Sequence, residues 1–183
     1  GDPPDSFQVH AGEELIGTWV AAERMEDLTP IFEREGFMEA FPDDLIELIS
    51  TDEGIWSVPV NIHRSNVLWF DPDRLDAWGV TVPNGWSEFI DETCPALQDQ
   101  GVTPLVVGEN WTVQHLWESV ALAELGNDDY SALFEGELPW TDLRVVAAWE
   151  TFGDVMECTN DDAAGLSWQQ ATDRIVAGDA AFN

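Results

Sequence analysis

Residues 55–70 read IWSVPVNIHRSNVLWF, and this stretch sets the organisation that we expect for the whole chain. Its apolar residues are mostly β-prone, and Pro59 marks an edge strand or a bend. Polar side chains interrupt it at Asn61, His63, Arg64 and Asn66. Only six residues of the chain, all arginine, carry a positive charge, so a cation in this position is unusual. The stretch predicts one or two strands whose polar side chains face something other than a core.

The charge of the chain narrows its possible partners. Among 183 residues, 37 acids oppose six arginines and there is no lysine, which gives a formal net charge of −31. Such a charge argues against binding to nucleic acid or to anionic membranes. The acids are spread evenly, which favours a surface adapted to high salt over an acidic mimic of nucleic acid, where clustered charge is expected. Hydrophobic residues make up 44% of the chain, so it is not disordered despite its charge. Its length of 183 residues is enough for one large domain or two incomplete lobes.

The ends and the two cysteines lead to further expectations. The start, GDPPDSFQVH, has no initiator methionine, and AGDAAFN stops in a predicted strand, so we expect part of a longer chain. No run approaches the roughly 18 apolar residues of a membrane span.

Cys94 and Cys158 have no metal-ligand spacing. They could form a bridge in an exported protein, but we expect free thiols on two helices.

Strand-like and helix-like segments alternate along the chain. We predict strands at residues 5–10, 103–108 and 180–183, and helices at 13–25, 28–32, 38–50, 71–79, 86–101, 110–126, 141–158 and 167–179. Ser167 and Gln170 have the spacing of a capping box at the start of the last helix. This alternation predicts an α/β fold with a mainly parallel sheet.

Position in such a fold singles out candidate ligand-binding residues, because ligands bind beyond the carboxyl ends of the strands. His10 ends the first predicted strand, Trp111 follows the second, and Trp168 opens the last helix. Simpler interpretations stay open for each of the candidates. Trp168 could extend an apolar helix stripe into the core, Trp111 and His115 could form a surface pair, and Arg64 could be an ion-pair partner. Residues 110–112 also form a glycosylation sequon, which conflicts with a cleft position for Trp111.

The chemistry of these residues suits a sugar. Motifs for serine hydrolases, zinc proteases, phosphate-binding loops and dinucleotide binding are absent from the sequence. A glycosidase needs two carboxylates, but 37 acids make any pairing uninformative. The histidines, His10, His63 and His115, are too scattered to predict a metal site, and nothing demands a cofactor. Indole rings stack on the apolar faces of a pyranose, while amide, imidazole and guanidinium groups bond its hydroxyls.

Several segments together resemble a known family. They are DSFQVHAGEEL, SVPVNIHRSNVLWFDPDRLDAWGV, NGWSEF, GVTPLVVG with WTVQHLWESVALAELG, and AAGLSWQQA with IVAGDAAFN. The resemblance is to extracellular solute-binding protein family 1, the relatives of maltose-binding protein that serve ABC sugar importers. The glucose-type monosaccharide branch is the most similar.

The resemblance implies a periplasmic-binding-protein-like clamp of two α/β lobes, here an incomplete portion of it. Residues 1–60 are expected to form part of the N-terminal lobe and residues 61–183 the major part of the C-terminal lobe. Residues 55–70 resemble the first crossing between lobes. Family members begin with further strands before DSFQVH and continue well past AAFN, where they carry a second stacking tryptophan.

The resemblance also implies a ligand site. It assigns a sugar hydrogen bond to His10, with Gln8 beside it, and sugar stacking to Trp168. Trp111 matches the cleft aromatics of the family more loosely. Asn61, His63 and Arg64, with Asn66, are expected to line or brace the cleft.

The function that follows is the binding component of an ABC sugar importer, without enzymatic activity. We expect it to bind a mono- or small oligosaccharide and to deliver it to the membrane permease. The expected protein is extracellular, lipid-anchored, halophilic and monomeric at full length. The alternatives are a carbohydrate-active hydrolase with an Asp/Glu pair and an acidic interaction module without a small ligand.

Overall fold

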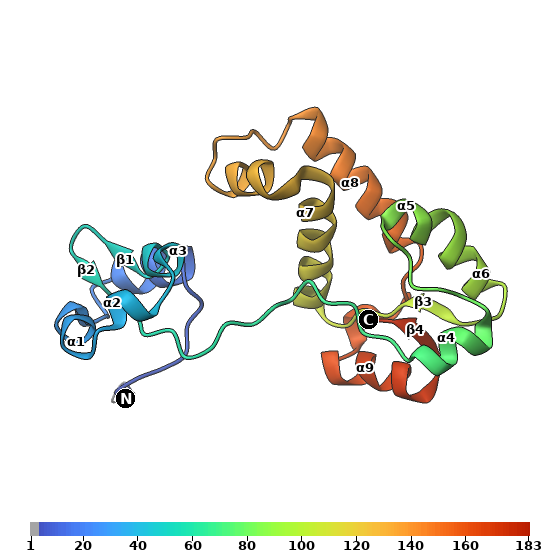
Figure 1. Cartoon of the computed structure of the whole chain (residues 1–183), viewed down its shortest axis with the longest axis horizontal. Coiled ribbons are helices and arrows are strands. Elements are labelled where there is room, and N and C mark those ends of the chain that lie inside the picture. The colour runs from blue at the N-terminus through green and yellow to red at the C-terminus, as the bar shows by residue number, and fades with distance from the viewer. Residues whose placement is uncertain (1–3) are drawn as a thin grey trace. The chain divides into compact units, whose positions relative to one another are not determined.

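The computed structural model describes residues 4–183 and divides the chain into two compact units, Gly1–His63 and Arg64–Asn183 (Figure 1). The division lies three residues beyond the boundary expected after residue 60. It falls inside residues 55–70, the stretch in which the sequence predicts a crossing. The assignment of the two units to an N-terminal and a C-terminal lobe stays a prediction.

The first unit is built from short elements around a small core. Its helices are η1 (Glu14–Val20), α1 (Thr29–Glu35), α2 (Phe37–Ala40) and α3 (Asp43–Glu47), and its antiparallel hairpin is β1 (Ser50–Thr51) with β2 (Gly54–Ile55). The core consists of the buried side chains of Leu15, Phe32, Ile49 and Ile55. The hairpin turn at residues 51–54 and the helices within 28–50 confirm the sequence predictions.

Three predictions for the first unit and the segment that follows it are wrong. Residues 5–10 form no strand, and the helix predicted over 13–25 ends at Val20. Of the β-prone stretch 55–70, only Ile55 lies in a strand, and Phe70 makes a single bridge to Phe182. A strand requires a partner that satisfies its backbone N–H and C=O groups, and β propensity alone does not supply one. Residues 60–69 are instead exposed along their whole length.

The second unit is organised around two parallel strands. Strands β3 (Thr103–Leu105) and β4 (Ala180–Phe182) pair Thr103 with Ala180 and Leu105 with Phe182. The helices around them are α4 (Pro72–Trp78), α5 (Trp86–Glu88), η2 (Phe89–Thr93), α6 (Cys94–Gln98), α7 (Asn110–Phe134), α8 (Leu143–Met156), η3 (Ala163–Gly165) and α9 (Trp168–Ala177). The α/β prediction is confirmed for this unit. Both expected strands are present and pair in parallel, and a helix lies at each position where one was expected after residue 70.

Helices α7 and α8 pack along one another and form one wall of the second unit (Figure 1). The indoles of Trp117 and Trp149 stack with their centroids 3.6 Å apart and an angle of 11° between the rings. Helix α7 continues beyond its predicted end at Gly126, after a break in which Gly126 has φ 74° and ψ 172°. Only glycine adopts this backbone conformation readily, so the residue that was expected to end the helix kinks it instead.

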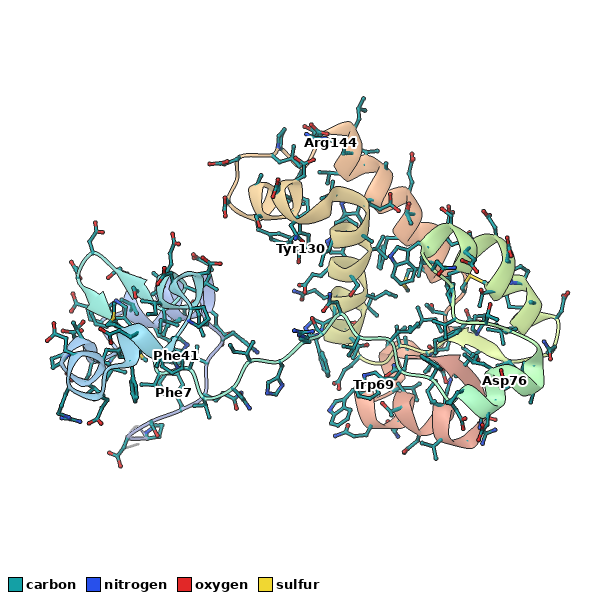
Figure 2. All side chains as sticks on the ribbon, viewed as in Figure 1. Phe7, Phe41, Trp69, Asp76, Tyr130 and Arg144 are labelled. Atoms are coloured by element: carbon teal, nitrogen blue, oxygen red, sulfur yellow. A yellow bond between two sulfur atoms is a disulfide. The ribbon has the colours of Figure 1, made fainter. Side chains whose placement is uncertain are left out.

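The two cysteines form a disulfide, so the expectation of free thiols is wrong. Cys94 begins α6, Cys158 follows the end of α8, and their Cα atoms are 5.8 Å apart. Both are buried beside Leu97, Leu105 and Val155, and the bridge is drawn as a yellow bond in Figure 2. The sequence predicts a helix at each cysteine, but Cys158 lies in the turn after α8, where its carbonyl accepts from the Leu105 N–H, while α6 packs on β3. The shared contact with β3 brings the two cysteines together.

Candidate functional site

A cleft of about 1060 Å³ opens in the second unit at the carboxyl ends of β3 and β4. Its floor includes Leu105 of β3, the residues Val106 and Val107 that follow this strand, and Phe182 of β4. All the lining residues lie between Ser65 and Asn183, so this unit forms the cleft by itself. The position agrees with the rule that ligands of α/β sheets bind beyond the carboxyl ends of the strands.

Three partly exposed indoles line the cleft, those of Trp69, Trp111 and Trp168. Their exposed fractions are 64%, 45% and 48%, so none of them is a core residue. Trp168 therefore does not extend the apolar stripe of α9, although Ala171 and Ile175 of that stripe are buried as expected. A fourth indole, that of Trp86, also lines the cleft but packs partly against the core.

Trp168 is held at the first position of α9 by a capped helix start. The Ser167 hydroxyl accepts from the Gln170 N–H, and the Gln170 side chain accepts from the Ser167 N–H, which confirms the predicted capping box. The N–H of Trp168 donates to Glu109 Oε1 at 3.4 Å, and the N–H of Glu109 donates to the Leu166 carbonyl at 2.8 Å. These bonds fix the start of α9 against the loop that precedes α7.

Close backbone approach explains the glycine at this junction. A Cβ on Gly108 would lie 3.0 Å from the Leu166 carbonyl oxygen and 3.1 Å from that of Ser167. Because backbone atoms cannot move aside cheaply, a larger residue would push the start of α9 away from the cleft. Gly108 thus sets the separation of the two helix starts that carry Trp111 and Trp168.

Trp111 and His115 share a face of α7, as their spacing predicts. Their ring centroids lie 5.3 Å apart at an angle of 75°, and both side chains line the cleft. Nearby, the Thr112 hydroxyl accepts from the Gly108 N–H and donates to the Glu109 carbonyl. The threonine of the sequon is therefore engaged in holding the first turn of α7, while Asn110 is exposed.

Asn183 joins three segments of the cleft floor. Its Nδ2 donates to the Val106 carbonyl at 2.7 Å, and its backbone exchanges two hydrogen bonds with the backbone of Trp69. Figure 2 labels Trp69 beside the C-terminal strand. Sequence reasoning missed both residues as site candidates. Asn183 follows the last predicted strand and could have been found by the same rule that selected Trp111.

Polar bonds brace the loop behind the cleft. Asn160 Oδ1 accepts from the Val107 N–H at 2.8 Å, and Asn160 Nδ2 donates to Asp162. The Arg174 guanidinium donates two hydrogen bonds to Asp162 and, together with Asn160, lowers the pKa of that carboxyl to about 2. Asp162 is consequently ionised at neutral pH and ties this loop to α9.

The carboxylates that line the cleft are Glu88 and Glu124. Glu88 accepts hydrogen bonds from the backbone N–H and from the side-chain amide of Asn84, at 2.9 Å and 2.8 Å. These bonds lower the pKa of the Glu88 carboxyl from its usual value. The cleft thus combines indole faces with amide, imidazole, hydroxyl and carboxylate groups.

The sequence of the chain matches the family model described as bacterial extracellular solute-binding protein over residues 1–183. The chain belongs to this family. A glucose-binding protein of Saccharolobus solfataricus, GlcS, is 28% identical over the whole chain, which covers 35% of that relative. An uncharacterized ABC transporter extracellular-binding protein of Pyrococcus horikoshii is 29% identical, again over the whole chain and over 42% of the relative.

Solved structures confirm the fold expected for this solute-binding family. A chitin oligosaccharide binding protein superposes with a TM-score of 0.76 at 18% identity, over 94% of this chain and 44% of its own. The chain therefore spans less than half the length of these relatives, which agrees with the expected incomplete portion of the clamp.

The other predicted ligand residues of this solute-binding chain do not line the cleft. Gln8, His10, Asn61 and His63 belong to the first unit and are all exposed, with His10 Nδ1 2.6 Å from Glu14 Oε2. Arg64 begins the second unit, is exposed and lies outside the cleft lining, whereas its neighbour Asn66 is part of it. Within residues 4–183, no helix is long and apolar enough to cross a membrane. The same residues contain no cluster of three potential metal ligands.

Proposed function

We propose that the protein is the sugar-binding component of an ABC importer, which takes up a mono- or small oligosaccharide and delivers it to a membrane permease. The observation that carries the proposal is the set of partly exposed indoles, Trp69, Trp111 and Trp168, around a cleft at the carboxyl ends of two parallel strands. Soluble folds do not usually leave large aromatic side chains in contact with water inside a concavity unless a ligand covers them.

The groups of the cleft match a sugar better than other small ligands. An indole covers the apolar C–H face of a pyranose and contributes on the order of 2 kcal/mol by area burial. Around the indoles lie planar amides and an imidazole, from Asn66, Asn84 and His115, which can bond ring hydroxyls. Similar proteins named as a glucose-binding protein and a chitin oligosaccharide binding protein support the same ligand class.

The chemistry of the cleft does not favour a hydrolase. A glycosidase requires one carboxylic acid with a raised pKa, which protonates the leaving oxygen, and a second carboxylate as nucleophile or base. Of the two carboxylates in the cleft lining, Glu88 is unsuited to the role of the acid, because hydrogen bonds from Asn84 lower its pKa. Binding and release, with no bond made or broken, is the mechanism that these groups support.

We propose that residues outside the cleft complete the ligand site. In this proposal His10 and Gln8 bond the sugar, and Asn61, His63 and Arg64 line or brace the site. Closure of two lobes around the sugar creates the surface that the permease recognises. The buried disulfide agrees with an oxidising, extracellular location, and we extend the proposal to a lipid-anchored monomer from a high-salt environment.

A panel of sugars tests the proposal on the natural full-length protein. Isothermal titration calorimetry should show saturable binding of at least one sugar, and chromatography of the same mixtures should show no product. Product release from any bound sugar would favour the hydrolase. The absence of binding to every mono- and oligosaccharide would overturn the sugar-binding function and favour the acidic interaction module.

A further inference from the structure

The first turn of α7 contains the only Asn-X-Ser/Thr sequon of the sequence, Asn110-Trp111-Thr112. In secreted proteins such a sequon is the acceptor of N-linked glycans, which are bulky and lie on the surface. A glycan on Asn110 and a ligand cleft beside Trp111 exclude each other only if the two side chains point the same way. The structure places them on different faces of the helix.

The helix geometry separates Asn110 from the cleft. Successive residues of an α-helix are turned by about 100° around its axis. His115 and Ser119, which line the cleft together with Trp111, therefore lie within about 80° of Trp111 on one side. Asn110 lies about 100° from Trp111 on the other side, and it is exposed and outside the cleft lining. A group attached to Asn110 thus projects into water and not into the cleft.

Helix capping does not explain the asparagine at this position. Asparagine is favoured at helix starts because its side chain accepts from free backbone N–H groups, and it does so from the N-cap position. In α7 the N-cap position belongs to Glu109, and the described residues give this helix start no side-chain capping bond. The Thr112 hydroxyl holds the first turn instead, through its bonds to Gly108 and Glu109. The Asn110 amide is therefore an exposed group without a capping role.

The expected location of the protein suits this modification. The chain belongs to a family of extracellular solute-binding proteins, and the Cys94–Cys158 disulfide agrees with an oxidising compartment. Sequons are used in proteins that are exported to such compartments. The inference that follows rests on the extracellular location that is part of the proposed function.

We propose that Asn110 carries an N-linked oligosaccharide. The donor is an oligosaccharide joined through phosphate to a membrane lipid. Asn110 Nδ2 forms a bond to the anomeric carbon of the first sugar, the bond from that carbon to the phosphate oxygen breaks, and Nδ2 loses one of its two protons. The phosphate leaves with the electron pair of the broken bond. Because the folded chain engages the Thr112 hydroxyl in backbone bonds, the transfer precedes the formation of α7.

Peptide mapping of the protein from its natural source tests the proposal. Mass spectrometry with fragmentation that retains glycans should show an increment of whole sugar residues on Asn110. Asn127 is the internal control, because it is also exposed on α7 but is followed by Asp128 and Asp129, which give no sequon. An unmodified Asn110, or the same increment on Asn127, overturns the proposal.

Two variants produced in the natural source test the dependence on the sequon. Asn110→Gln removes the acceptor nitrogen from its position and should lose the increment completely. Thr112→Ser keeps both the sequon and the hydroxyl and should retain the increment. An increment that survives Asn110→Gln overturns the proposal, and so does its loss in Thr112→Ser.

Sugar titrations of the same preparations test where the glycan projects. The glycosylated protein and the Asn110→Gln variant should bind a given sugar with affinities that differ by less than about twofold, because Asn110 is outside the cleft lining. A larger difference overturns the placement of the glycan away from the cleft. Sugar binding by a protein without a glycan refutes this proposal alone, whereas a glycan on a protein that binds no sugar refutes only the proposed function.

Discussion

The two units of the chain, Gly1–His63 and Arg64–Asn183, stabilise their cores by different means. The first has helices of seven residues or fewer and a hairpin with two-residue strands around four buried side chains. The second has the 25-residue helix α7, a parallel strand pair and a buried disulfide. The cleft lies in the second unit, where backbone hydrogen bonds join Trp69 to Asn183 and a capping box holds the start of α9. The predicted site residues Trp111 and Trp168 line this cleft, whereas the predicted site residues of the first unit lie on exposed segments.

Charge adds to the contrast. The first unit has 15 acids and two arginines, a net charge of −13 over 63 residues, whereas the second has 22 acids and four arginines, −18 over 120 residues. The smaller unit thus carries more negative charge per residue on a smaller core. Four predictions use this contrast, in order of decreasing effect.

Removal of the disulfide should destabilise the second unit alone. With the cysteines 64 residues apart, the chain-entropy model gives about 4 kcal/mol of stabilisation. We expect the Cys94→Ala/Cys158→Ala variant to lose this protection in amide hydrogen exchange of residues 64–183, with residues 4–63 unchanged. Thiol labelling of the unfolded, unreduced protein should modify neither cysteine. Labelling of both cysteines would show that the disulfide is absent, and equal loss of protection in the two units would show that it does not stabilise the second unit alone.

Substitution of Trp168 should act on binding and leave folding intact. A stacked indole worth about 2 kcal/mol corresponds to roughly 30-fold in affinity at 1.4 kcal/mol per decade. Trp168→Ala in the natural full-length protein should therefore weaken sugar binding about 30-fold, and the melting temperature of the sugar-free protein should stay the same because the ring is about half exposed. Trp140→Ala is a suitable control, since Trp140 is equally exposed but outside the cleft lining. Unfolding with unchanged affinity would show that Trp168 is a packing residue.

His10 tests whether the first unit contributes to the same ligand site. A hydrogen bond worth about 1 kcal/mol predicts that His10→Ala weakens sugar binding about fivefold. The His10 side chain is exposed and contacts Glu14, so stability should not change. Glu14→Gln is the control, because it removes the charge of that contact and keeps the imidazole. An affinity unchanged by His10→Ala would remove His10 from the proposed ligand site.

The salt dependence of stability should differ between the two units. Between molar KCl and about 0.1 M, the screening length grows from roughly 3 Å to 10 Å, so repulsion among exposed acids increases. We expect the melting temperature of the first unit, followed by segment-resolved hydrogen exchange, to fall about 3 °C further than that of the second. A shift of that size is below 1 kcal/mol for a unit of this length. Melting that is independent of KCl in both units would contradict adaptation to high salt.

Local sequence signals determined much of the second unit. The capping box at Ser167 and Gln170, the apolar stripes of α7 and α8 and the final strand are all features that a few neighbouring residues specify. The family was also predictable, because several segments resemble it in combination. The same signals selected Trp111, which follows β3, and Trp168, which opens α9, and both line the cleft. Their role in ligand binding stays a prediction.

Features that depend on distant partners could not be determined in this way. The sequence of residues 5–10 and 57–68 favours strands, but a strand forms only where another backbone pairs with it, and within residues 4–183 none pairs with these two segments. Both cysteines are buried among apolar residues, but they come within bonding distance only because α6 packs on β3 and the turn after α8 accepts a hydrogen bond from Leu105 of β3. Trp69 and Asn183 lie 114 residues apart and join the cleft floor because the backbone of β4 extends far enough to pair with residues 69 and 70. The sequence therefore determined the local elements and the family, and the tertiary structure decided which side chains from distant segments form one cleft.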